Sequence, residues 1–279
     1  MAESRALQVE DWPIATQVER PYLSVVIPAY NESRRLPANL PKVFAYLDGQ
    51  PYAAEVIVVD DGSEDDIASI VERFQKEHPN LRLIRNPHRG KAYTVRTGVL
   101  AARGCYIFQC DADLSMPVEE LAKLLKALEE GYDVVVGWRA RRYHLPWYRQ
   151  IMSLIYHLVV QAIVVRGVRD TQSGFKCYRR PVAHDIFRRT MLYSGEAEIK
   201  GPAVTGFDVE ILFLAQQSGY RIKEVPVEWY YAERSTVNPI KDSLRNLGDV
   251  IRVRLNDLQG KYRHARAAKG DMGASAPEL

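Results

Sequence analysis

Short apolar segments alternate with longer segments of helical periodicity through the first half of this sequence. Five of them are predicted strands, at residues 23–28, 55–60, 81–84, 105–110 and 132–137. Strands that are apolar on both faces are typical of a parallel sheet covered by helices on both sides. Four successive strand–helix alternations therefore predict an α/β fold with a mostly parallel sheet and right-handed crossovers.

The 279 residues leave room for one large domain, which we expect to span residues 21–260. Residues 1–20 and 261–279 are predicted to be flexible ends, because they are polar and show no periodicity. The 38 lysines and arginines nearly balance the 35 aspartates and glutamates, which argues against a nucleic-acid-binding protein. The three cysteines show no metal or disulfide spacing, and no apolar run reaches the roughly 18 residues of a membrane span. We therefore expect a cytoplasmic protein.

Two aspartates follow the apolar segment 105–110. Asp111 and Asp113 are separated by one residue, so in extended backbone they can point the same way. Two carboxylates suit Mg²⁺ or Mn²⁺, which complete their coordination with water and substrate phosphates. Ligands of open α/β sheets bind beyond the carboxyl ends of the strands, which is where this pair is predicted to lie.

Other charged residues follow the remaining predicted strands, and we expect the same sheet edge to gather them. They are Glu32, Asp60, Asp61, Lys91 and Arg139. Carboxylates that read a base or ribose, a metal that neutralises a diphosphate, and cations for an anionic acceptor are what nucleotide-sugar chemistry requires. The phosphate-binding loops of ATPases and dehydrogenases are missing from the sequence, which disfavours both classes.

The second half of the chain is less regular. Residues 151–165 are almost wholly apolar and follow a segment of arginines and aromatic residues. This segment is either a helix lying in a membrane interface or a buried core helix with a solvated basic lead-in. Residues 207–217 are predicted to form an amphipathic helix, and residues 239–258 a last helix that is also a candidate for the membrane interface.

Five motifs in chain order resemble the family-2 inverting glycosyltransferases of the GT-A fold. They are Val-Ile-Pro-Ala-Tyr-Asn-Glu (26–32), Val-Asp-Asp-Gly-Ser (59–63), Arg-Gly-Lys (89–91), Asp-Ala-Asp-Leu-Ser (111–115) and Asp-Thr-Gln-Ser-Gly-Phe-Lys (170–176). With residues 165–169 and 207–211, the chain is similar to the polyprenyl-phosphate sugar transferases, the dolichyl-phosphate β-glucosyltransferases more than the mannose synthases. The resemblance covers residues 22–262 and implies a GT-A sheet with flanking helices and C-terminal amphipathic helices.

The resemblance also implies a role for each matching residue. The resemblance implies that the base and ribose are bound by Pro28, Tyr30, Glu32 and Asp61. It implies that the nucleotide sugar is contacted by Asp111 and Ala112. Asp113 is the expected Mg²⁺ or Mn²⁺ ligand, with Asp111 and Ser115 as further candidates. Arg139 and Arg149 match phosphate-holding arginines, Lys91 and Lys176 are further substrate-binding candidates, and Asp208 lies where relatives place a base.

The implied activity is inverting transfer of glucose or mannose from UDP-glucose or GDP-mannose to a polyprenyl phosphate, by a protein peripheral to the cytoplasmic membrane face. A lipid phosphate is already an anionic nucleophile, so positioning and leaving-group neutralisation matter more than a strong base. Relatives often carry a membrane anchor, which is not expected here, and residues 191–205 look longer than in the glucosyltransferases.

Three other functions stay open. The chain could glycosylate a small soluble acceptor such as glycerate or phosphoglycerate. It could be a non-catalytic nucleotide-sugar sensor, although the intact aspartate pair disfavours this. A nucleotidyltransferase is a more distant alternative, because its glycine-rich N-terminal loop is missing. The sequence leaves the donor base and the oligomeric state undecided.

Overall fold

A seven-stranded sheet forms the centre of the computed structural model, which describes residues 20–139, 147–193, 206–230 and 239–262. The strand order is β3-β2-β1-β4-β6-β5-β7. All neighbouring strands are parallel except at β6, which runs antiparallel to both β4 and β5. The strands are β1 (Leu23–Ala29), β2 (Ala54–Asp60), β3 (Leu81–Arg85), β4 (Tyr106–Gln109), β5 (Val134–Arg139), β6 (Lys176–Arg179) and β7 (Ile222–Val227).

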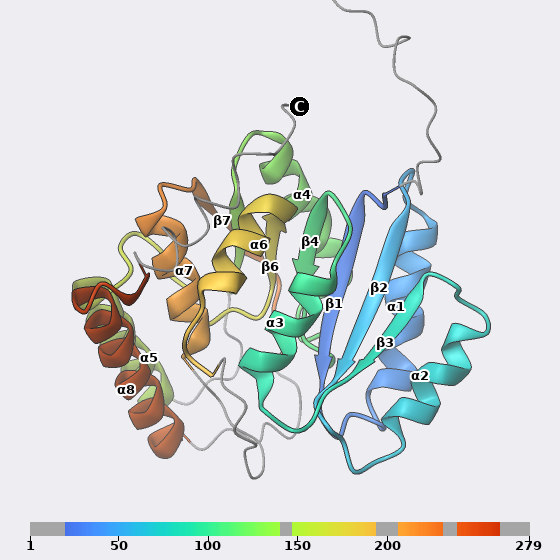
Figure 1. Ribbon diagram of the computed structural model, residues 1–279, viewed down its shortest axis with the longest axis horizontal. Coiled ribbons are helices and arrows are strands. Elements are labelled where there is room, and N and C mark those ends of the chain that lie inside the picture. Colours follow the sequence, from blue (N-terminus) through green and yellow to red (C-terminus); the bar gives the residue numbers. More distant parts are fainter. Residues whose placement is uncertain (1–19, 140–146, 194–205, 231–238, 263–279) are drawn as a thin grey trace, which may run out of the picture.

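Helices cover both faces of this sheet (Figure 1). Alternate residues of β1 show why: Val26 packs into one hydrophobic core, and Val25 and Ile27 pack into the other. The core on the second face includes α1 (Leu36–Asp48), α2 (Ile67–Gln75) and α4 (Leu121–Glu129), which follows the short 3₁₀ helix η2 (Val118–Glu120). The first core includes α3 (Lys91–Ala101), α6 (Arg180–Arg189) and α7 (Phe207–Gln217), with α5 (Trp147–Ile163) and α8 (Pro239–Leu258) outside them.

The structure confirms the predicted α/β class and corrects several local expectations. Pro28 does not end the first strand, because β1 continues to Ala29 along β2 while its pairing with β4 stops at Val26. Helix α3 ends at Ala101, with Ala102 in extended backbone. The predicted ends at 1–20 and 261–279 lie almost entirely outside the described residues.

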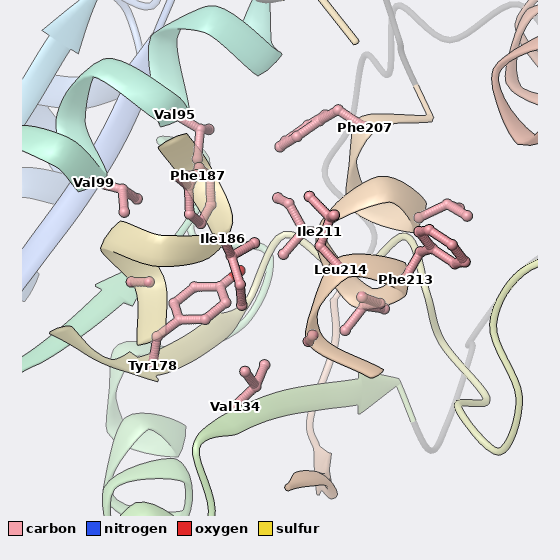
Figure 2. Close-up of a cluster of buried hydrophobic side chains, with 14 of the residues drawn as sticks. Val95, Val99, Val134, Tyr178, Ile186, Phe187, Phe207, Ile211, Phe213 and Leu214 are labelled. Carbon is pink, nitrogen blue, oxygen red and sulfur yellow. The ribbon is translucent and has the colours of Figure 1, made fainter. Parts of the chain in front are cut away.

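Helix α7 is buried rather than amphipathic. Every residue from Phe207 to Ala215 is buried, including two acidic ones. Figure 2 shows the apolar part of this packing, with Phe207, Ile211, Phe213 and Leu214 of α7 beside side chains of β5, β6, α3 and α6. The helix is enclosed because α6 packs on one side of it and α8 on another, which its own sequence pattern does not reveal.

Glu210 is a fully buried acid on α7, and three groups donate hydrogen bonds to its carboxylate. They are the backbone N–H groups of Met191 and Leu192, at 2.8 and 3.0 Å, and the Tyr262 hydroxyl at 2.7 Å. Burial raises the pKa of Glu210 to about 7, although these hydrogen bonds oppose the shift. The folded protein therefore keeps this proton between about pH 4.5 and 7, where the unfolded chain releases it.

Glu210→Gln should accordingly flatten the pH dependence of stability. Because the folded-state pKa is raised, the stabilising contribution of Glu210 is complete at low pH and is lost as the pH rises toward 7, by up to about 1.4 kcal/mol per pH unit. Urea unfolding at pH 5, 6, 7 and 8 measures this. The wild-type protein is expected to lose stability relative to the variant across the series, and two parallel profiles would contradict the assignment.

Candidate active site

Four parallel strands deliver chemically active residues to one edge of the sheet. Tyr30 follows β1, Asp61 follows β2, His88 lies beyond β3, and Asp111 and Asp113 follow β4. Arg139 is the last residue of β5. Since β6 is antiparallel, its first residue rather than its last lies at this edge, and that residue is Lys176.

Ion pairs connect most of the carboxylates at this edge to a basic residue. Lys91 Nζ lies 2.5 Å from Asp111 Oδ1, and Arg35 Nη1 lies 3.0 Å from Glu32 Oε1. Lys176 Nζ lies 2.6 Å from Asp208 Oδ1 in a buried pair and also donates to the Ser173 carbonyl. The remaining pair joins Arg139 to Asp170, whose carboxylate is buried.

Asp113 differs from these acids, because within the described residues no ion pair joins its carboxylate to a basic group. Its Oδ1 accepts a hydrogen bond from the backbone N–H of Ser115 at 2.9 Å. The next residue, Leu114, has a φ of 46°, a conformation that costs energy in a non-glycine residue and is commonest at functional sites. Asp113 is thus a partly exposed carboxylate held in a specific turn, and among the described residues it has no basic side chain in ion-pair contact.

The turn also changes how the aspartate pair is arranged. Because β4 ends at Gln109 and residues 112–113 form a turn, strand alternation does not place Asp111 and Asp113, contrary to the expectation from spacing. Burial raises the pKa of Asp111, but the charge and hydrogen bond of Lys91, with help from Lys176 and Arg139, hold it below its usual value. Asp111 is therefore a charged anchor for Lys91 rather than a second uncompensated acid.

Gly174 packs directly against the Asp111 carboxylate. A Cβ atom at position 174 would lie 2.7 Å from Asp111 Cγ, closer than real Cβ atoms approach other heavy atoms. The 170–176 loop can therefore approach Asp111 only because residue 174 lacks a side chain. The same loop supplies Asp170 and Lys176, so one backbone segment positions an acid and a cation around the site.

The Arg139 side chain is held by a bidentate ion pair with Asp170. Its Nε and Nη2 donate to the two carboxylate oxygens of Asp170, each at 2.7 Å. Burial lowers the pKa of Arg139, but the charge of Asp170 outweighs this and raises it. The backbone N–H groups of Arg169 and Asp170 donate in turn to Glu224, at 2.7 and 3.0 Å. An acceptor phosphate at Arg139 would share the guanidinium with Asp170.

The remaining predicted residues are distributed around this edge. Pro28 is buried within β1, and the carbonyl of buried Ala112 accepts a hydrogen bond from Asn39 at 3.0 Å. Burial raises the pKa of Glu32, Arg35 opposes this, and nearby Asp113 raises it further. Ser115 donates its backbone N–H to Asp113. Arg149 belongs to α5, but its side chain lies outside the described residues.

Three residues of this site were not assigned roles from the sequence: His88, Asp170 and Gly174. Asp170 and Gly174 lie in the Asp-Thr-Gln-Ser-Gly-Phe-Lys segment, so the motif indicated the right loop without indicating what each residue contacts. His88 lies outside the five motifs and had no sequence signal. All three act through residues distant in the sequence, namely Asp61, Arg139 and Asp111.

The donor set fits a divalent cation that binds few protein groups. The described residues contain no cluster of three or more His, Cys, Asp or Glu side chains able to enclose a metal. Asp113 instead offers one partly exposed carboxylate that no described basic residue pairs with, which suits Mg²⁺ or Mn²⁺ completing its coordination with water and a diphosphate. An edge with this acid, fixed cations and an aromatic side chain on the neighbouring loop can bind a nucleoside diphosphate and neutralise it as a leaving group.

Comparison with known proteins agrees with this chemistry. The family model described as "Glycosyl transferase family 2" matches residues 24–187. The chain is 34% identical over 271 residues to a dolichyl-phosphate β-glucosyltransferase from Drosophila melanogaster, covering 88% of this chain and 78% of the relative. A protein of the same name from Dictyostelium discoideum is 32% identical over 267 residues, with coverages of 88% and 78%.

Among solved structures, the fold is similar to glucosyl-3-phosphoglycerate synthase from Mycobacterium tuberculosis, determined with Mn²⁺, UDP-glucose and phosphoglyceric acid. The TM-score is 0.57 at 18% identity, covering 85% of this chain and 79% of the other. The fold and the sequence relatives define a glycosyltransferase of the GT-A class. The chain belongs to glycosyl transferase family 2.

Proposed function

We propose that this glycosyltransferase moves a hexose from a nucleotide sugar to a polyprenyl phosphate, with inversion at the anomeric carbon. The relatives that share about a third of its residues are dolichyl-phosphate β-glucosyltransferases, which favours glucose as the sugar. The structural observation that supports a lipid acceptor is an exposed apolar surface on α5 and α8.

Seven of the eight exposed large hydrophobic residues in the described chain lie on α5 and α8. We call these residues the apolar face: Leu154, Leu158, Ile163, Leu244, Ile251, Leu255 and Leu258. The two helices pack against each other at one side of the molecule (Figure 1). No helix within the described residues is long and apolar enough to cross a membrane.

Helix α8 is unusual because it buries three polar residues and exposes several large apolar ones. Asn246, Asp249 and Asn256 are buried, whereas Leu244, Ile251, Leu255 and Leu258 form a stripe that is 66%, 48%, 50% and 69% exposed. A surface helix whose outer side faces only water normally carries polar residues on that side, in place of such a stripe. Exposed Arg252 and Arg254 flank the stripe, as expected of a helix lying on an anionic lipid surface. Peripheral binding at the cytoplasmic membrane face follows from the proposal.

Helix α8 is also hydrogen-bonded to the segment that leads into α7 and the site. Asp249 of α8 accepts a hydrogen bond at 2.9 Å from the backbone N–H of Gly206, the residue that precedes α7. Asp208 lies in the first turn of α7 and pairs with Lys176. A prenyl chain lying along α5 and α8 would thus bring its phosphate toward the cations of the site.

In the proposed reaction, Mg²⁺ or Mn²⁺ on Asp113 would supply charge neutralisation to the departing diphosphate. Lys91, held by Asp111, would bind the donor phosphates, and Arg139 and Lys176 would orient the acceptor phosphate. Asp208 is committed to Lys176, so it serves as a positioning residue rather than as a base. This agrees with an acceptor that is already ionised and needs no proton removed.

An acceptor panel tests the function. Purified protein with Mn²⁺ would be given UDP-glucose or GDP-mannose and, separately, polyprenyl phosphate in detergent, 3-phosphoglycerate or glycerate. Transfer is expected to polyprenyl phosphate alone. Efficient transfer to phosphoglycerate or glycerate would replace the lipid acceptor with a small soluble one, and donor binding without any transfer would favour a sensor.

Replacing the α8 stripe should abolish vesicle binding. Leu244, Ile251, Leu255 and Leu258 would all be changed to Ser, and each change removes about 2 kcal/mol of apolar burial in the lipid. Co-sedimentation with phosphatidylcholine vesicles containing phosphatidylglycerol is expected to fall at least 100-fold. Tyr230→Ser, at an exposed residue on neither helix, is the control. The sedimentation could instead be unchanged, with a wild-type protein that is a dimer in solution and a variant that is a monomer. That result would make the apolar face a contact between two copies.

A further inference from the structure

His88 makes two well-defined contacts at the donor side of the site. Its ring stacks on Tyr30, with centroids 4.0 Å apart and an interplanar angle of 6°. Its Nδ1 lies 2.8 Å from Asp61 Oδ2 and 3.0 Å from the Asp61 carbonyl oxygen. One imidazole therefore connects the loops that follow β1, β2 and β3.

The Asp61 carboxylate is buried and is satisfied largely by the segment that contains His88. Its Oδ1 accepts the N–H of Arg89 at 2.9 Å, and its Oδ2 accepts the N–H of Gly90 at 2.8 Å. Gly90 is also the residue that precedes α3, where Lys91 begins the helix. Asp61 thus fixes the backbone that leads to Lys91, and His88 fixes Asp61 from the side.

Hydrogen bonds also join the loop that follows β1 to the loop that follows β2, which restricts movement of Tyr30. Asn31 has a φ of 54°, and its backbone N–H donates to the Ser63 hydroxyl oxygen at 2.9 Å. Its side-chain oxygen accepts a hydrogen bond from the Glu64 N–H at 3.0 Å. Gly62 has a φ of 70°, and a Cβ there would lie 2.7 Å from the backbone nitrogen of His88. Close approach of the two loops therefore depends on Gly62.

A stack of this kind has a specific use at the edge of a parallel sheet. Tyr30 follows β1, next to β4 with its aspartates, where the sheet order turns and nucleotides bind in open α/β folds. An aromatic ring stacks on any nucleobase, and it does so at lower entropic cost when its orientation is already fixed. His88 supplies that fixation, because it covers one face of Tyr30 and is itself held by Asp61.

We propose that His88 is a positioning residue for the donor, which orders Tyr30 and Asp61 for the nucleobase end of a nucleoside diphosphate. The inference rests on the proposed use of a nucleotide sugar but is independent of the acceptor. It predicts that His88 contributes to binding of the nucleoside and contributes nothing to binding of the diphosphate.

Three variants separate the two contacts of His88. His88→Phe keeps a ring for the stack and loses the hydrogen bond, His88→Asn keeps a donor near the position of Nδ1 and loses the ring, and His88→Ala loses both. Calorimetric titration with UDP, GDP and inorganic pyrophosphate, each with Mn²⁺, measures the effect. The better-bound nucleotide is expected to lose at least tenfold in affinity in His88→Ala and less in the other two, with pyrophosphate affinity unchanged.

Two further readouts exclude a general loss of structure. At saturating donor, kcat is expected to stay within about twofold of wild type while the donor KM rises, and Asp113→Asn is the contrasting variant that weakens pyrophosphate as well. Nucleotide affinity that is unchanged in all three His88 variants would overturn the inference, as would equal losses for nucleotide and pyrophosphate. Failure of the lipid acceptor in the panel above would leave these binding results intact, so the two proposals fail separately.

Discussion

Asp113→Asn is expected to abolish sugar transfer, by at least 1,000-fold in kcat, without unfolding the protein. A bound metal lowers the barrier by several kcal/mol at a departing diphosphate, and each 1.4 kcal/mol is a factor of ten in rate. Asparagine keeps an oxygen that can accept the Ser115 N–H, so the turn is preserved. The substitution removes the carboxylate charge, which no described basic group contacts in an ion pair.

Thermal unfolding provides the control for this variant. Without metal, the melting temperature of Asp113→Asn is expected to stay close to that of wild type, because the substitution relieves repulsion with Glu32 but also removes attraction to Lys91. Addition of Mn²⁺ and UDP should stabilise only the wild-type protein, by an amount set by ligand concentration relative to Kd. Transfer at near wild-type rate by Asp113→Asn would remove Asp113 from the reaction.

Gly174→Ala is expected to cost at least 100-fold in transfer rate. The added methyl would overlap the Asp111 carboxylate, which must then move away from Lys91 or push the 170–176 loop outward. A displacement of about 1 Å in a catalytic group is enough for a loss of this size. Steady-state kinetics with both substrates varied would record it.

Gly248→Ala is the matched control for Gly174→Ala. Gly248 is an exposed helical glycine of α8, and a Cβ there would meet nothing within 4 Å. The substitution is expected to leave activity unchanged and to stabilise the helix by about 0.5–1 kcal/mol. If Gly174→Ala were as active as Gly248→Ala, the close approach of the loop to Asp111 would have no role in transfer.

The elements of the fold were largely predictable because their signals are local. Apolar runs and turn residues located β1 to β5, and the boundaries of α7 and α8 matched the structure. The position of β6 in the sheet was not predictable from the sequence. This strand follows β5 and α5 in the chain, but it lies between β4 and β5 and runs antiparallel to both. That insertion is what brings Lys176 to the same edge as Asp111, and nothing near Lys176 in the sequence signals it.

The partners in the site were less predictable than its members. The motifs indicated Asp111, Asp113 and Lys176, and the family resemblance indicated Arg139. Which acid has no ion-paired basic residue among those described depends on contacts between distant loops. Asp170 meets Arg139 across 31 positions, and Asp208 meets Lys176 across 32. The burial of α7 and the outward apolar stripe of α8 likewise arise from tertiary packing, which encloses α7 and leaves one apolar side of α8 exposed.

The anomeric configuration of the product tests the central claim most directly. The protein would be incubated with Mn²⁺, polyprenyl phosphate and UDP-glucose, or GDP-mannose if that is the donor it accepts, and the product linkage determined by proton NMR. Both donors carry an α-linked sugar, so direct attack by the lipid phosphate predicts a β-linked hexosyl phosphate on the prenyl chain. An α-linked product would contradict inversion, and sugar found only on a soluble acceptor would contradict the lipid substrate.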